Sequence, residues 1–106
     1  MPLDIQRSVA ATFAAHLHSV FRLRDQSTAL ELALIEVADG STSRQVSFSL
    51  LFRGPQQPPL AQQIYLFEHD DLGGFDLFIV PIRQDAQGRY YEAIVNRMIE
   101  PPTRSE

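Results

Sequence analysis

The spacing of apolar residues changes early in the chain, from a helical repeat to an alternating one. Val9, Phe13 and Leu17 recur at intervals of four, and Ser8 stands where a helix N-cap is expected. From residue 16 onward most segments alternate apolar and polar residues, which is the pattern of strands with one buried face. The sequence therefore predicts one short N-terminal helix followed by strands.

Several segments carry the strand pattern, and two of them contain a local signal. In residues 28–37 the apolar positions change face between Leu34 and Ile35, which predicts a bulge or a strand buried on both sides. Gly54-Pro55 ends the next segment, because proline cannot donate to a strand ladder. The predicted strands cover residues 16–24, 28–37, 44–53, 63–69, 74–82 and 89–99.

These segments are joined by short polar loops, and no crossover helix is long enough for a parallel unit. We therefore predict an all-β fold, a small antiparallel six-stranded barrel or sandwich with one short N-terminal helix. A chain of 106 residues fits a single domain, residues 1–106. The ends, residues 1–7 and 100–106, are expected to be flexible.

Charge and cysteine content narrow the function classes. The formal charge is −4, and all nine basic residues are scattered arginines, which argues against a nucleic-acid or anionic-membrane surface. No apolar run reaches the roughly 20 residues of a membrane span. Cysteine is absent, so disulfides and thiolate metal sites are excluded, and a reducing compartment fits the chain. We expect a soluble cytoplasmic protein that binds neither nucleic acid nor membrane.

The stretch His69-Asp70-Asp71 lies between two strand segments, directly before Leu72-Gly73-Gly74. Adjacent side chains on an extended segment point to opposite faces and rarely converge on one ion. Tight turns recruit aspartate because its carboxylate bonds nearby backbone N–H groups, and they recruit glycine for positive φ angles. We interpret the stretch as the polar tip of a hairpin.

His16 and His18 are the sharper metal signal, since a spacing of two on a strand places both imidazoles on one face. His69 would supply a third ligand if it came near. Arg22 and Arg24 continue the same predicted face and oppose a cation electrostatically. His16, His18 and His69 are therefore candidates only, and no metal or other cofactor is assigned.

The remaining polar strand residues suggest no catalytic site. Ser47 and Ser49 lie on the outward face of their strand, without the sharp turn that a nucleophilic serine needs. Glu92 sits in an apolar strand, where a raised pKa could make an acid or base, although pairing with Arg53 or Arg83 is the commoner outcome. No catalytic residue is assigned. A small-molecule or metal-binding barrel, with His16, His18 and Glu92 around an internal pocket, is the alternative.

Three stretches, "FSLLFRGP", "IYLFEHDDLGGFDLFIVPI" and "YYEAIVNRM", carry a family resemblance. The chain resembles a bacterial family of small all-β proteins with a domain-of-unknown-function label. The matching residues run from Phe52 to Pro55, Tyr65 to His69, Leu72 to Gly73, Phe75 to Pro81 and Tyr91 to Ala93, and residues 13–37 resemble the family's N-terminal half. The resemblance implies an association with genes for phage-tail-like proteins and no catalytic residues.

Together these observations predict an uncharacterised, non-enzymatic structural or protein-interaction module, with an assembly role in a phage-tail-like system. The predicted partner is another protein or a second copy of the chain, reached through an exposed strand edge or a loop.

Overall fold

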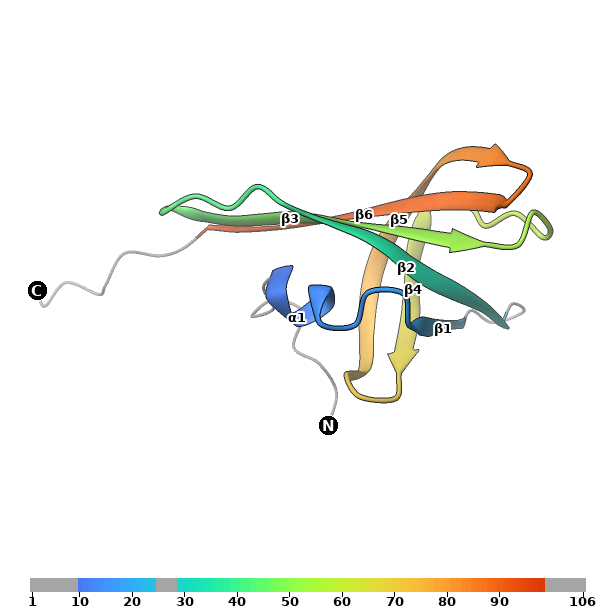
Figure 1. Cartoon of the computed structure of the whole chain (residues 1–106), viewed down its shortest axis with the longest axis horizontal. Coiled ribbons are helices and arrows are strands. Elements are labelled where there is room, and N and C mark those ends of the chain that lie inside the picture. The colour runs from blue at the N-terminus through green and yellow to red at the C-terminus, as the bar shows by residue number, and fades with distance from the viewer. Residues whose placement is uncertain (1–9, 25–28, 99–106) are drawn as a thin grey trace, which may run out of the picture.

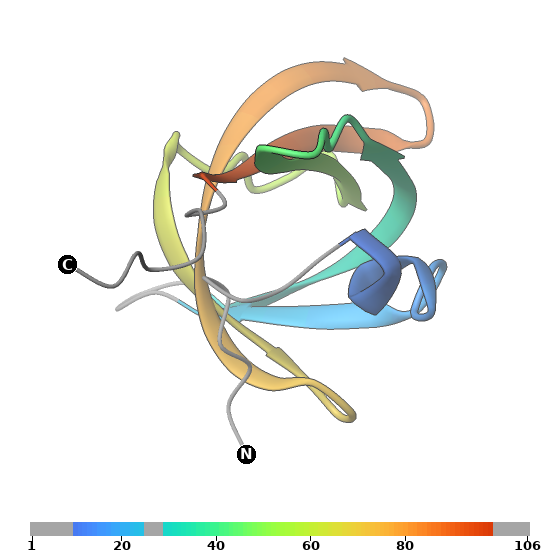
Figure 2. The same cartoon turned by 90° about the vertical axis from the view of Figure 1, so that its left-hand side faces the viewer.

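Six antiparallel strands form a sheet that closes on itself (Figures 1 and 2). A computed structural model describes residues 10–24 and 29–98, and the predicted flexible ends at 1–7 and 100–106 lie outside these ranges. The strand order around the ring is β1-β2-β3-β6-β5-β4, with β1 returning to pair with β4. The elements are α1 (Ala10–Ala14), β1 (Val20–Arg24), β2 (Ala29–Asp39), β3 (Gln45–Gly54), β4 (Gln63–His69), β5 (Gly73–Asp85) and β6 (Gly88–Met98).

The predicted fold class is confirmed, since the described residues form an all-β ring of six antiparallel strands with one short helix before them. The helix is shorter than its apolar repeat suggested. Its last turn tightens, with the N–H of His16 donating to the carbonyl of Phe13, and Leu17 beyond it is 40% exposed. Ser8 and Val9 lie outside the described residues.

The first strand begins at Val20, so the predicted strand from residue 16 is wrong over its first four residues. Residues 15–18 form a turn, in which His18 has a φ of 71°. Alternation of apolar and polar residues does not show this left-handed conformation, which non-glycine residues adopt rarely. The turn connects α1 to β1.

The change of face predicted in the second strand is a bulge. Leu34 pairs with Phe52 and Glu36 with Leu51, so Ile35 has no residue opposite it on β3. The inward set before the bulge, Leu32 and Leu34, is fully buried. An extra residue of this kind bends a strand and increases its twist, which helps a sheet to curl into a ring.

The helix α1 lies at one end of the ring (Figure 2). Phenylalanine side chains pack together in the interior and contact this helix. Phe13 of α1 is fully buried and lies 5.7 Å from Phe48 and 5.8 Å from Phe75, measured between ring centroids. Phe21 and Phe52 continue the cluster at 5.4 Å in an edge-to-face arrangement. The helix thus closes one end of the ring with a single aromatic side chain.

The ring is unevenly held together. β3 and β6 pair along their whole lengths, from Gln45↔Met98 to Gly54↔Arg89. Among the described residues, β1 and β4, which close the ring, pair over Arg22↔Glu68, Leu23↔Phe67 and Arg24↔Leu66. We call the β1–β4 contact the seam. Its two ion pairs join Arg24 to Glu68 at 3.2 Å and Arg22 to Asp70 at 3.0 Å.

β5 changes its partner along its length. Residues Gly73 to Ile79 pair with β4, whereas the pairing with β6 runs from Val80↔Glu92 to Asp85↔Gly88. Figure 1 shows β6 continuing beside β3 after β5 has turned away. No described helix is long and apolar enough to cross a membrane.

Candidate functional site

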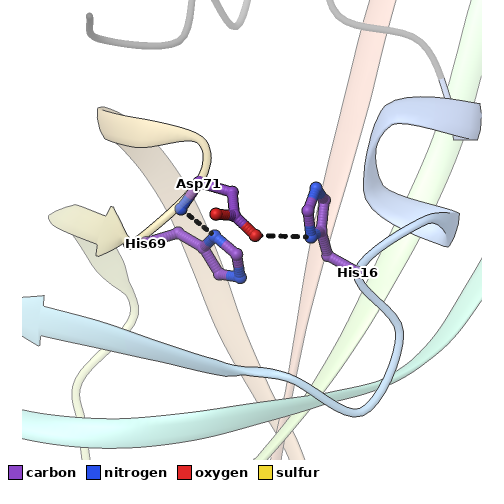
Figure 3. A group of neighbouring side chains, drawn as sticks. All are labelled: His16, His69 and Asp71. Carbon is purple, nitrogen blue, oxygen red and sulfur yellow. Dashed lines mark hydrogen bonds and ion pairs between the residues drawn. The ribbon is translucent and has the colours of Figure 1, made fainter.

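His69 ends β4 and is buried, with 5% of its surface exposed. Its Nδ1 accepts hydrogen bonds from the backbone N–H groups of Asp71 at 3.0 Å and Leu72 at 3.3 Å. Its Nε2 lies 2.9 Å from the Oγ of Ser19, which in turn donates to the carbonyl of His16. Figure 3 shows His69 and Asp71 from the β4–β5 hairpin facing His16 from the corner between α1 and β1.

These contacts assign the protonation state of the imidazole. Because Nδ1 accepts two hydrogen bonds, it carries no proton, and Nε2 must carry the single proton of the neutral ring. Nε2 therefore donates to Ser19, whose own hydroxyl proton goes to the carbonyl of His16. We call this chain from the β4–β5 turn through His69 and Ser19 to His16 the histidine clip.

The surroundings of His69 favour the same neutral form. Its pKa is lowered from the usual value, first because burial disfavours the charged ring and then because His16 lies nearby. Asp71 and Asp70 raise the pKa and oppose these two effects. Phe21 packs against the imidazole with a centroid distance of 4.5 Å, so one face of the ring is apolar.

The hairpin tip contains the predicted residues, but the predicted hydrogen bonds are wrong. The turn comprises residues 70–72, and Gly73 follows with a positive φ of 81°, as expected. The turn N–H groups are bound by His69 rather than by an aspartate carboxylate. Asp70 instead pairs with Arg22 at 3.0 Å, and the Asp71 carboxylate lies 3.7 Å from Nδ1 of His16.

The predicted pairing of His16 with His18 is also wrong. Both residues precede β1 and lie in the turn after α1, so the alternation of a strand does not apply to them. His18 is exposed, whereas His16 contacts His69 edge-to-face at 4.7 Å between ring centroids. The structure thus brings together His16 and His69, two of the three metal candidates, and leaves His18 outside.

His16, His69 and Asp71 each offer one possible metal ligand, and these atoms lie within 4.8 Å of one another. Two imidazoles and a carboxylate are a reasonable zinc donor set. However, a metal on His69 needs a free lone pair, and Nδ1 is engaged by the turn while Nε2 faces Ser19. Coordination would therefore replace the hydrogen bonds that shape the turn. The geometry favours a structural role for these side chains.

The other candidates do not join this group. Glu92 is half-buried and lies on the outward side of β6, opposite Leu51 on one neighbour and Val80 on the other. Arg83, one of its predicted partners, pairs with Asp85 and stacks on Tyr90. The structure does not bring His16, His18 and Glu92 to a common cavity.

A hollow lies over the β1–β2 hairpin. It has a volume of about 600 Å³, and a second hollow of about 270 Å³ adjoins it, sharing Glu31 and Pro55. Arg22, Arg24 and Glu31 line the first hollow, but Arg22 is already paired with Asp70 and Arg24 with Glu68. Its charges are therefore largely compensated, and it carries no converging set of reactive groups.

Large apolar side chains lie exposed on the outer face of β4 and β5. Ile64 and Phe78 are opposite each other in the β4–β5 ladder, with 63% and 47% of their surfaces exposed. Leu66 follows on the same face of β4 and is also exposed. We call Ile64, Leu66 and Phe78 the outer apolar band.

Sequence reasoning missed the partner of His69. Ser19 is 50 residues away along the chain, and nothing in its local sequence separates it from other serines before strands.

The comparisons with known proteins give one match. No curated protein and no solved structure matches the chain. The family model described as a domain of unknown function, DUF6916, matches residues 9–95. Since this match covers most of the 106 residues, the chain belongs to the DUF6916 family.

Proposed function

We propose that the protein is a non-enzymatic structural module that binds another protein through its outer surface. The outer apolar band is the observation that carries this proposal. Phe78 is the one phenylalanine of the seven that does not lie in the buried cluster, and it lies against Ile64, which is exposed to a similar extent. Exposed apolar side chains in contact with one another mark interaction surfaces more often than isolated ones do.

The interior supports an interaction role over ligand binding. Phenylalanine, leucine and tyrosine side chains fill the ring, and the hydroxyl of Tyr91 accepts the buried N–H of Leu60. The described hollows lie over β1, β2 and the segment around Pro55. A ring packed in this way is a rigid scaffold that presents its outer face.

An assembly role fits the association with genes for phage-tail-like proteins that the family resemblance implies. Such assemblies stack rigid subunits, and a small closed sheet supplies a surface whose backbone changes little on binding. In this proposal the protein acts in the cytoplasm, where those assemblies are built.

The test is site-specific photo-crosslinking in cells that express the chain from its native locus. A photoreactive phenylalanine analogue is placed at Phe78 or Ile64 in the band, and at exposed Thr42 or Gln87 as controls. We expect one discrete protein adduct from both band positions and none from the controls. Adducts that are the same at all four positions, or absent from the band, would overturn the proposal.

A further inference from the structure

Among the described residues, part of one edge of β6 has no strand partner, and the direction in which its backbone groups point can be assigned. Pro81 is opposite Tyr91 in the β5–β6 ladder and has no N–H, so this is not a hydrogen-bonded pair. In an antiparallel ladder hydrogen-bonded and non-hydrogen-bonded pairs alternate. The backbone groups of Glu92 therefore face β5, and those of Tyr91 and Ala93 face β3.

The same alternation continues to the end of β6. Ile94, Asn96 and Met98 each lie an even number of residues after Glu92. Their N–H and C=O groups therefore point in the same direction as those of Glu92, away from β3. Beyond Glu92, however, β5 pairs with β4 and no longer with β6. Within residues 10–24 and 29–98, no strand pairs with this edge of residues 93–98, which we call the open edge.

The open edge lacks the usual protection against pairing. Natural edge strands are blocked by proline, by a bulge or by an outward lysine. Residues 93–98 contain no proline or lysine and one charged residue, Arg97, and the β3–β6 register runs through them without a shift. The outward residues Ile94 and Asn96 are uncharged, with Ile94 60% exposed and Asn96 also exposed.

We propose that a second copy of this chain pairs with the open edge, so that two β6 strands lie antiparallel and the two sheets become continuous. This inference rests on the proposed function, because it names self-association as one form of the interaction. The partner follows from polarity: although each chain carries a charge of −4, the described outward side chains of the open edge, Ile94 and Asn96, are uncharged. A two-fold axis can therefore bring the edges together without placing like charges opposite each other.

The free groups also fix the register. A two-fold axis at Asn96 sets Asn96 opposite Asn96 of the second copy, and Ile94 opposite Met98 of the second copy. All backbone groups that face the open edge then find partners, and Glu92, which is bound by β5, is not required. An axis at Val95 would bring Met98 against Glu92 of the second copy, where β5 already lies.

The dimer is expected to be weak. Five residues of strand span about 17 Å, so the buried area falls below the roughly 800 Å² per partner of a stable complex. We expect a dissociation constant between about 10 µM and 1 mM. The dimer should appear as a concentration-dependent mass and not as a permanent one.

The experiment is sedimentation velocity of the purified full chain from about 5 µM to about 1 mM, across the expected dissociation constant. Two variants address the edge. Ile94→Lys places a charge on it, and Asn96→Pro removes an N–H that faces it while leaving the ladder with β3 intact. Ile82→Lys is the matched control, since Ile82 is also an exposed isoleucine, at 45%, but lies at the β5–β6 bulge, outside both residues 93–98 and the outer apolar band.

We expect the wild type and Ile82→Lys to dimerise, and at least a tenfold weaker association for both edge variants. Circular dichroism should show that all four proteins are folded. A monomer at about 1 mM, or association that neither edge variant weakens, would overturn the open-edge dimer. Failure here is separate from failure of the proposed function, because the photo-crosslinks at Phe78 and Ile64 report on the outer apolar band and not on β6.

Discussion

Replacing His69 by alanine is expected to destabilise the fold by about 2–4 kcal/mol. The variant removes the acceptor of two turn N–H groups and the donor to Ser19, and each such bond contributes about 0.5–1.5 kcal/mol. It also leaves a small void beside Phe21, against which the imidazole packs. For a domain of this size, the loss corresponds to a melting temperature lower by roughly 10–25 °C.

Asparagine at the same position separates the turn from the rest of the clip. Its side-chain oxygen can occupy the place of Nδ1 and accept the N–H groups of Asp71 and Leu72, as asparagine does in many turns. The contact with Ser19 and the packing of the ring are lost. We therefore expect His69→Asn to cost about half as much as His69→Ala, that is about 1–2 kcal/mol.

The two variants also differ from the wild type in their response to acid. The pKa of His69 is lowered in the folded state, so between that value and the unfolded value of about 6.5 the unfolded chain binds more protons. Stability therefore rises with pH across this window. The contribution of the neutral ring is fully present above about pH 6.5 and is lost as the pH falls toward the lowered folded-state pKa. Neither variant has this group, so both should lose less stability on acidification.

The assay is urea unfolding followed by circular dichroism at pH 7.5 and at intervals down to pH 5. The free energies of unfolding of the three proteins are compared at each pH. Equal losses for asparagine and alanine would show that the turn acceptor contributes nothing. A difference between wild type and His69→Asn that stays constant with pH would refute the neutral, doubly engaged imidazole.

Three further predictions test the fold and the clip. Tyr91→Phe leaves the buried N–H of Leu60 without its acceptor and should cost about 1–3 kcal/mol in thermal unfolding. Gly88→Ala places a Cβ against the carbonyl of Gly54 at a φ of 146°, and should lower the melting temperature more strongly than alanine at exposed Gly40. Zinc at about 1 mM should not raise the melting temperature, because both nitrogens of the buried imidazole are engaged; a rise that a chelator reverses would contradict this.

Local patterns in the sequence predicted most of the sheet. Alternation located the strands, Gly54-Pro55 ended β3, and the change of face at Ile35 predicted a bulge. Each of these features depends on residues that are neighbours along the chain. Where the backbone adopted a conformation that alternation does not signal, as at His18, the predicted strand and the predicted metal pair were wrong together.

The ring order and the histidine clip depend on contacts between distant residues. Ser19 and His69 meet because β1 pairs with β4, and β1 pairs with β4 because the sheet curls through the bulge at Ile35 and the shift after Pro81. Single-sequence patterns carry no information on strand order. The candidate site was therefore predicted as a set of residue types, and its hydrogen bonds were not.

The seam and the open edge lie in different parts of the ring and differ in stability. The seam has three residue pairs, and Ser19 and His69 lie directly beside them at the start of β1 and the end of β4. Loss of the clip should therefore expose the amides of β1 and β4 to hydrogen exchange before those of β3 and β6, which are paired along their whole lengths. The open edge belongs to that more stable β3–β6 ladder. A second copy can thus add a strand at β6 without opening the ring, and acid that weakens the clip should loosen the seam well before it disturbs the dimer.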